Sequence, residues 1–330
     1  MSNSHWTAAQ AASILGIDVS QATLDCFRLS DQRHWQVPNT PQGWQTLVTT
    51  LTHEPPALVV LEATGKLEAG VVVALDAGGF TPAVENPLHV KHFRRSLGRR
   101  AKTDRSDAEV LALYGERVQP VPRAVAPEIE RELRALLARR EQLTKQRTQE
   151  KNRATRTDGA AGASVARMLV VLTAERKTID ALLAGLVATE PRIQSRVTRL
   201  QSVPGIGVYL ATVLAVELRE LGQLPKRALA ALVGVAPYNQ ESGTHVGARS
   251  IGGGRPRVRR GLFQAVQTTV RLDPALQAHY QQLRARGKCH KQAIVASINR
   301  LLGILNVMER DDLVWAQTKV GQGVFLPSAA

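Results

Sequence analysis

The first part of the chain is a succession of short apolar segments separated by polar turns. Three closely spaced segments predict the strands of an antiparallel meander: 13–19, 22–29 and 33–37. Two later apolar runs predict buried strands: 57–61, just before Glu62, and 80–84. Helical patterns lie between and after these strands: 42–51, 66–77 and a segment from Pro87 onward. Three meander strands followed by alternating helices and strands predict an α/β domain with a mixed sheet.

After Pro127 the pattern changes to long helices. Residues 128–155 contain neither proline nor glycine, and their apolar side chains recur at helical spacing. The same pattern resumes over 165–187 after two glycines, so two amphipathic helices are expected to form an antiparallel arm. The remaining faces of the first helix are rich in arginine and lysine. Such a face is usually a solvated one; the basic excess also suits contact with nucleic acid or with a second copy of the chain.

The last third is helical with two interruptions. The first, Val203-Pro-Gly-Ile-Gly207, lies between helical patterns at 192–200 and 209–220. A Gly-x-Gly turn between helices exposes backbone N–H groups that hold a phosphate, as in a helix-hairpin-helix element. The alternative is an ordinary connecting turn. The second interruption, 236–260, is rich in glycine and arginine and precedes a helical region at 262–305. It is interpreted as a functional loop, with a flexible linker as the alternative.

These patterns divide the chain into three parts. An α/β domain is expected over 1–125, a coiled-coil helical arm over 126–190, and a mainly α C-terminal domain over 191–330. The length of 330 residues and the hydrophobic content of 44% are sufficient for more than one folded core.

Composition narrows the class of partner. The 43 lysines and arginines exceed the 28 aspartates and glutamates and give a net charge of +15, which attracts phosphate backbones or anionic membranes. No apolar run approaches the ~18 residues of a membrane span, and no secretory signal is present. The only two cysteines, Cys26 and Cys289, have no spacing typical of zinc sites, so a reducing cytoplasm is expected. Nucleic acid is therefore the favoured partner, with no membrane association.

An acidic pair lies in a strongly basic segment. Asp104 and Asp107 fall in the first turn of a predicted helix that begins after Thr103, and residues three apart share one helix face. Acids in a first turn also stabilise the helix dipole, which is the simpler explanation. Six basic residues crowd the same segment and are candidates for contact with nucleic acid: Arg94, Arg95, Arg99, Arg100, Lys102 and Arg105. This mixture suits a metal site that receives a polyanion.

Two further acids interrupt or end apolar strands. Asp18 lies within the first predicted strand and Glu62 ends the fourth, where a charge is costly unless it is paired or bound to a metal. With Asp104 and Asp107 they form a candidate site for Mg²⁺ or Mn²⁺. Surface-facing acids at a strand edge are the alternative. Position in the chain does not exclude the other acids of this domain: Asp25, Asp31, Asp76 and Glu85.

The loop at 236–260 carries a candidate nucleophile. Ser242 precedes Gly243, which allows a sharp turn that exposes the hydroxyl. Arginines from the same segment are candidates for gripping phosphate oxygens. The candidate nucleic-acid contacts in the second half of the chain are Gly205, Gly207, Arg249, Arg255, Arg257, Arg259 and Arg260.

The motifs occur in one order along the chain: Gly16-Ile-Asp-Val-Ser20, Glu62-Ala-Thr-Gly65, Asn86-Pro87, Lys102-Thr-Asp-Arg-Ser-Asp-Ala108, Pro204-Gly-Ile-Gly207, Gly234-Val-Ala-Pro237, Ser242-Gly243, Gly253-Gly-Arg255 and Arg286-Gly-Lys288. As a set they closely resemble the DEDD transposases of bacterial insertion sequences, a family described as bridge-RNA-guided recombinases. The resemblance runs from about residue 14 to about residue 315. Each motif alone is weak, whereas the ordered set is specific.

The resemblance implies a fold and a chemistry. The N-terminal domain is expected to have an RNase H/RuvC-like mixed sheet, with Asp18, Glu62, Asp104 and Asp107 as the four metal-binding acids. Ser242 would be the nucleophile of the C-terminal transposase domain, forming a covalent phosphoserine intermediate. The long helices would be the family's coiled-coil arm. The implied partners are donor and target DNA, a structured guide (bridge) RNA and further copies of the chain, in a dimer or tetramer.

Two other functions are compatible with the same residues. One is a RuvC-like nuclease in which a metal-activated water cuts DNA and Ser242 is structural. The other is a non-catalytic nucleic-acid-binding protein in which the acids have lost their role. The complete set of acids and the Ser-Gly pair favour the recombinase.

Overall fold

The computed structural model describes residues 13–98, 104–238, 241–242, 245–246 and 250–318. Side chains at 104–106 and 241–246 are not described within these ranges. Contacts divide the chain into two compact units, Met1–Ala126 and Pro127–Ala330. The long helices belong to the second unit, and the division into three domains stays a prediction.

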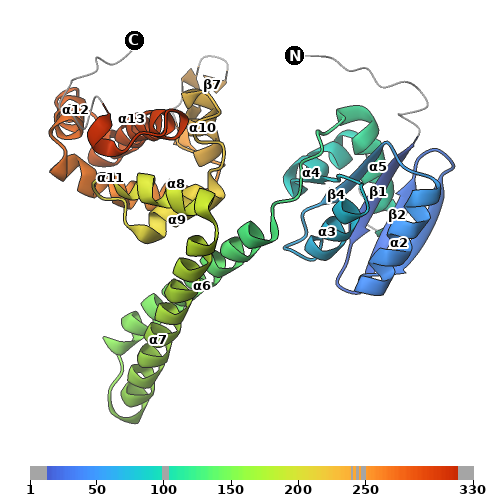
Figure 1. Ribbon diagram of the computed structural model, residues 1–330, viewed down its shortest axis with the longest axis horizontal. Helices are drawn as coiled ribbons and strands as arrows, with labels where there is room; N and C mark the ends of the chain where they lie inside the picture. The colour runs from blue at the N-terminus through green and yellow to red at the C-terminus, as the bar shows by residue number, and fades with distance from the viewer. Residues whose placement is uncertain (1–12, 99–103, 239–240, 243–244, 247–249, 319–330) are drawn as a thin grey trace. The chain divides into compact units, whose positions relative to one another are not determined.

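The first unit is built on one mixed sheet (Figure 1). Its strands are β1 (Ile14–Val19), β2 (Thr23–Arg28), β3 (Arg33–Pro38), β4 (Leu58–Glu62) and β5 (Ala83–Glu85). Their order is β3-β2-β1-β4-β5. The first three strands pair antiparallel as a meander, and β4 is parallel to both β1 and β5. The expected mixed sheet is confirmed.

Helices cover both faces of this sheet. They are α2 (Pro41–His53), α3 (Ala69–Ala77), α4 (Pro87–Ser96) and α5 (Asp104–Val118). The alternation of strand side chains explains this arrangement. Leu15 and Ile17 of β1 face the apolar cluster that includes the buried leucines of α2 and α3. Ile14 of β1 and Val60 of β4 face the cluster of α4 and α5. Two thin apolar layers therefore hold the unit together.

Two predicted elements of this unit have different bounds. The helix expected at 66–77 begins only at Ala69, because Gly65 and Lys66 have positive φ angles of 67° and 89°. The Glu68 carboxylate accepts hydrogen bonds from the N–H groups of Thr64 and Lys66 and holds that turn. The strand expected at 80–84 is shorter and lies at Ala83–Glu85.

Helix α5 lies directly on β1 at a glycine. A Cβ atom added to Gly16 would lie 2.1 Å from the carbonyl oxygen of Ala108 and 2.5 Å from the backbone nitrogen of Ala112. One added to Gly115, near the other end of α5, would contact Ile14 at the start of β1. The helix therefore runs antiparallel to β1, and its first turn lies at the end of the sheet where β1 finishes.

The second unit begins with the predicted arm. It consists of α6 (Glu128–Ala154) and α7 (Gly159–Thr189), which pack side by side as a long hairpin (Figure 1). Leucines of α6, including Leu133 and Leu137, are buried with Ile179 and Leu183 of α7. The second helix starts earlier than the pattern at 165–187 predicts, because Gly159 and Gly162 are helical. An antiparallel pair of long helices is confirmed.

The rest of the unit is a body of helices: α8 (Pro191–Gln201), α9 (Val208–Glu217), α10 (Lys226–Val233), α11 (Pro256–Leu272), α12 (Pro274–Ala285), α13 (His290–Arg310) and the 3₁₀ turn η1 (Trp315–Gln317). Helix α9 is its centre, since every residue from Leu210 to Val216 is buried. Among the described helices, none combines the length and apolar character needed to cross a membrane.

Two short strand pairs connect α10 to α11. The first pair is β6 (Pro237–Tyr238) with β9 (Ser250–Ile251), and the second is β7 (Glu241–Ser242) with β8 (His245–Val246). The predicted loop at 236–260 is therefore wrong over its last residues, because α11 already begins at Pro256. Arg257, Arg259 and Arg260 lie in the first turns of this helix.

Candidate active site

A row of carboxylates crosses four neighbouring strands. Asp18 of β1 is opposite Asp25 of β2, and Glu62 of β4 is opposite Glu85 of β5. The register of β1 with β4, which pairs Ile17 with Leu61, places Asp18 beside Glu62. Residues at one level of a sheet face the same side, and here that side carries α4 and α5. Like charges directly opposite one another destabilise a sheet, so this end is built to receive positive charge.

The first turn of α5 brings the remaining acids to the same end. Ala108 and Ala112 contact Gly16, two residues before Asp18, so the preceding turn lies where β1 ends. Asp107 is only 5% exposed. Asp104 is the first residue of α5, and its side chain lies outside the described ones. The backbone thus places all four predicted acids at one end of the sheet.

Arg94 of α4 forms an ion pair with Asp107. Its Nη2 atom lies 2.7 Å from Asp107 Oδ1, and the Arg94 side chain is 16% exposed. Arg94 was expected to contact nucleic acid; in this structure it neutralises a candidate metal ligand. A buried carboxylate needs a positive partner, and a guanidinium group supplies it here.

Asp25 and Glu85, the other two acids of the row, are held by neighbours. The side-chain amide of Gln36 donates to Asp25 Oδ1 at 3.1 Å. The Tyr114 hydroxyl donates to Glu85 Oε2 at 3.2 Å. Burial, together with the nearby Glu85 charge, raises the pKa of Tyr114, so the phenol remains a donor. Sequence reasoning left Asp25 and Glu85 open; strand register is the signal that places them beside Asp18 and Glu62.

The described carboxylates do not converge on one point. Among the described residues, no three His, Cys, Asp or Glu side chains are grouped closely enough to hold a metal ion. Asp107 points to Arg94, and the Asp104 carboxylate lies outside this comparison. The residues nevertheless suit a hard divalent cation, because they are oxygen donors from three elements at one sheet end. The metal-binding set stays a prediction.

Ser242 lies in a two-residue hairpin strand. The strands β7 and β8 pair Ser242 with His245 across a turn that lies outside the described residues. The sharp turn predicted at Ser242-Gly243 lies outside the described residues and stays a prediction. Its hydroxyl is not described, and its role as nucleophile stays a prediction.

Several predicted basic contacts lie wholly or partly outside the described residues. Arg99, Arg100, Lys102 and Arg249 fall outside them, as does the expected cap Thr103. Arg105 is in α5, but its side chain is not described. Arg95 is exposed at the end of α4. Their contact with nucleic acid stays a prediction.

The arginines of the C-terminal segment hold the protein together. Arg255 forms two bonds of 2.6 Å with Glu220. Arg257 joins the arm to the body, because it pairs with Glu141 of α6 at 2.8 Å and with Glu217 of α9. Arg260 also pairs with Glu141. These arginines were expected to contact phosphate, and their acidic partners were not foreseen from the sequence. Their contact with phosphate stays a prediction.

The remaining arginine of this segment binds backbone oxygens, and the ion pairs of the other arginines shift the pKa values of their acidic partners. Arg259 Nη1 donates to the carbonyl oxygens of Gly253, at 2.6 Å, and Gly234, at 3.2 Å, and so fixes the turn after α10. Burial alone would raise the pKa of Glu141, but its bonds from Arg257 and Lys145 lower it below the usual value. The pKa of Glu220 is lowered mainly by the hydrogen bond from Arg255.

The Gly-x-Gly turn packs on α11. Gly205 has a φ of +90°, and a Cβ atom there would lie 2.7 Å from the carbonyl oxygen of Ala265. The Thr269 hydroxyl donates to the carbonyl oxygen of Pro204 at 2.7 Å. Packing therefore explains Gly205. No described atom lies within 4 Å of a Cβ added to Gly207, the residue before α9, so a phosphate contact there stays a prediction.

Two family models match the chain. The model of IS110-type DEDD transposases, described as a transposase, matches residues 15–157. The model described as the transposase IS116/IS110/IS902 family matches residues 197–281. One model covers the row of acids and α5, and the other covers the helical body that includes Ser242.

Individual proteins are similar over different lengths. A pilin gene-inverting protein of Moraxella bovis is 28% identical over 311 residues, which are 88% of this chain and 93% of that protein. An uncharacterised 43.6 kDa protein of the insertion element IS110 from Streptomyces coelicolor is 32% identical over 165 residues, 49% of this chain and 40% of that protein. The structure of T. thermophilus RuvC in complex with a Holliday junction substrate is similar over 33% of this chain and 98% of the RuvC chain, at 18% identity and a TM-score of 0.25.

Proposed function

Because the chain belongs to the IS116/IS110/IS902 family of transposases, enzymes that act on DNA, we propose that it is an RNA-guided recombinase that cuts and rejoins DNA through Ser242. The observation that carries the proposal is the row of carboxylates at the sheet end, with the acidic first turn of α5 beside it. A pilin gene-inverting protein among the relatives supports a reaction that both breaks and rejoins DNA.

Asp18, Glu62, Asp104 and Asp107 would hold Mg²⁺ or Mn²⁺ in this proposal. A bound divalent ion stabilises negative charge on a phosphoryl oxygen and lowers the pKa of a coordinated hydroxyl. The protein's own contribution is to assemble oxygen donors from β1, β4 and α5 on a rigid sheet. Arg94 keeps the nearly buried Asp107 neutralised in the conformation described here.

The proposed cleavage step conserves the energy of the phosphodiester bond. The Ser242 hydroxyl loses its proton, and its Oγ atom forms a bond to phosphorus. One deoxyribose oxygen leaves the phosphorus and takes up a proton to become a hydroxyl group. The reverse reaction with a different strand end rejoins DNA and frees the serine, so neither step needs an oxidant or a nucleotide.

Guidance and assembly complete the proposal. Pairing of a structured non-coding RNA with donor and target DNA supplies the sequence specificity, and the protein contacts mainly backbone and shape. The net charge of +15 and the 4% aromatic content suit this division of labour. The acids and the serine lie in different structural units. A homo-oligomer, dimer or tetramer, allows units of different copies to complete one active site.

The test is a search for a covalent protein–DNA adduct. The protein is incubated with Mg²⁺, the non-coding RNA that flanks its element, and labelled donor and target DNA, and the products are separated on a denaturing gel. A labelled adduct is expected with the wild type and with the matched control Ser250→Ala. It should be absent with Ser242→Ala and with Asp104→Ala.

Two other results would overturn the proposal. Cleaved DNA without an adduct, still produced by Ser242→Ala, would establish the water-using nuclease. Binding of DNA and RNA that survives loss of all four acids, without cleavage under any metal condition, would establish a non-catalytic nucleic-acid-binding protein.

A further inference from the structure

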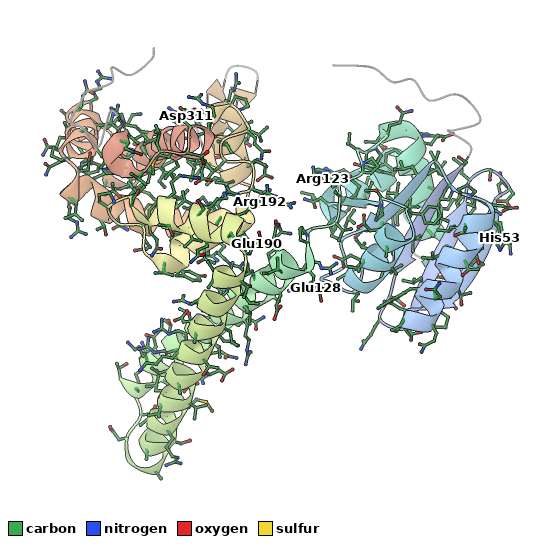
Figure 2. All side chains as sticks on the ribbon, viewed as in Figure 1. His53, Arg123, Glu128, Glu190, Arg192 and Asp311 are labelled. Carbon is green, nitrogen blue, oxygen red and sulfur yellow. The ribbon has the colours of Figure 1, made fainter. Side chains whose placement is uncertain are left out.

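An arginine-lined cleft lies in the second unit, away from every residue assigned above. It has a volume of about 560 Å³ and lies between one side of α8, the chain after α9 and the end of α13. Five arginines line it: Arg192, Arg196, Arg199, Arg219 and Arg310. Arg192 is the second residue of α8 and is labelled in Figure 2. None of the five belongs to a motif used for the proposed function.

Two of these arginines are fixed in place by the protein. Glu309 has a side chain only 4% exposed, and it accepts from Arg196 Nε at 2.7 Å and from Arg199 Nη1 at 3.1 Å. Arg196 also donates to the carbonyl oxygens of Ala215 and Leu218. These bonds hold the guanidinium groups at the floor of the cleft without further loss of side-chain freedom on binding.

The other three arginines lie nearer to solvent. Arg192 is exposed. Arg219 is 45% exposed and pairs with Glu130 at 3.2 Å. Arg310 is 59% exposed and pairs with its neighbour Asp311. Ion pairs between exposed side chains contribute little, so these guanidinium groups can exchange their carboxylate partners for phosphate at small cost.

The charge balance of the cleft favours a polyanion. Among its described lining residues are five arginines and two acids, Glu309 and Asp312, both of which pair with the arginines of α8. Guanidinium groups bind phosphate oxygens in pairs, and a cavity of this volume is in the range of ligand sites. No aromatic side chain lines it, so bases would not be stacked there. The chemistry is that of contact with a phosphate backbone without reading of sequence.

We propose that this cleft binds the phosphodiester backbone of a nucleic acid. The proposal rests on the proposed function only in requiring a nucleic-acid partner, and it is independent of the serine chemistry. The ligand chemistry is common to DNA and RNA, and the experiment below separates these two sources.

The test measures binding as a function of salt. Fluorescence anisotropy of a labelled 20-base-pair DNA duplex and of a labelled 20-nucleotide RNA is recorded between 50 and 200 mM NaCl. The variant is Arg192→Ala with Arg310→Ala, and the charge-matched control is Arg167→Ala with Arg271→Ala, two exposed arginines on α7 and α11. Circular dichroism melts of each protein verify that folding is unchanged.

The expected result is a smaller salt dependence for the cleft variant. Each phosphate contact contributes about 0.9 to the slope of log affinity against log salt on duplex DNA, so two contacts correspond to about a twelvefold effect over this fourfold range. The control should keep the wild-type slope. A variant with Arg192→Lys and Arg310→Lys should keep the slope and lose affinity, because lysine retains the charge but not the paired bonds.

Each outcome has one meaning. A reduced salt slope with the DNA duplex alone assigns DNA to the cleft, and a reduced slope with RNA alone assigns RNA. A reduced slope with both probes assigns the backbone that DNA and RNA share. A cleft variant with the wild-type slope for both probes, or an equal loss in the control, overturns the proposal. The readout is binding and not cleavage, so a failure of the serine chemistry remains distinct from a failure of the cleft.

Discussion

The sheet end and the base of the arm both bring acids and arginines together, and the two places are built differently. At the sheet end, carboxylates from neighbouring strands stand side by side, with Arg94 paired to Asp107. At the base of the arm, acids and arginines interleave: Glu141 of α6 contacts Arg257 and Arg260, and Arg257 also contacts Glu217. The same types of side chain are therefore arranged differently in the two places.

The difference is one of charge balance and of connection. Interleaved opposite charges satisfy each other and join the arm to the body, because each arginine reaches across two elements. Adjacent carboxylates on one sheet level repel each other, and a bound cation, as proposed above, would compensate that repulsion. Residue type alone does not distinguish a structural ion pair from a catalytic acid; the neighbours across the fold do.

The largest effect is expected from removing one charge at the sheet end. Asp18→Asn should lower the rate of DNA cleavage by on the order of 10²-fold or more, because the proposed metal site would lose one of its carboxylate ligands. Unfolding by urea verifies that the variant remains folded, so that a loss of activity can be assigned to the site. Asp76→Asn, on an exposed part of α3, should retain wild-type activity. Equal damage by Asp25→Asn would show that the acid on the neighbouring strand shares the role.

The second effect concerns the contact between α5 and β1. Gly16→Ala should lower the free energy of unfolding by about 1–3 kcal/mol, because its Cβ would overlap the backbone of α5. Activity should fall as well, since the first turn of α5 would move away from Asp18. Gly185→Ala is the matched control: it has no described atom within 4 Å of the new Cβ and lies within α7. It should raise stability by about 0.5–1 kcal/mol; both values come from urea titration.

The third prediction breaks the interleaved network at the base of the arm. Glu141→Gln should cost about 1–3 kcal/mol, because Arg257 and Arg260 lose their shared acceptor charge. Glu150→Gln, whose partner Arg153 is 64% exposed on the same helix, should cost less than about 1 kcal/mol. Chemical denaturation measures both. Equal costs would contradict the distinction between a bridging and a surface pair.

The smallest effect is a dependence of stability on pH. The pKa values of Glu141 and Glu220 lie below their usual value of 4.5 in the folded protein. The unfolded chain therefore takes up these protons first as pH falls, so the stabilisation is present above pH 4.5 and is lost below it. The melting temperature should decline on acidification through this range, and less steeply in Glu141→Gln. Parallel curves for the two proteins would contradict the assignment.

Local periodicity was sufficient for most elements of the fold. The meander strands, the buried strand before Glu62 and the helix expected at 42–51 lie where alternation and helical spacing place them, the helix as α2 at Pro41–His53. The predicted bounds were wrong where a local hydrogen bond or a turn sets the first residue of a helix. The hydrogen bonds of the Glu68 carboxylate hold a turn before α3, so that helix begins later than predicted. Helix α11 begins at Pro256, inside the predicted loop. Side-chain capping and a first-turn proline act over a few residues and leave little periodic signal.

The sequence by itself determined the candidate catalytic acids: Asp18 and Glu62 in or at the end of apolar strands, and the acidic pair that opens α5. Only the tertiary structure decided which other residues share that sheet end, because strand register brings Asp25 and Glu85 into the same row. It also decided that Arg257 bridges the arm and the body, and that arginines of α8 and α13 line one cleft. The physical reason is that helix and strand patterns are local, whereas charges pair across contacts between residues more than a hundred positions apart.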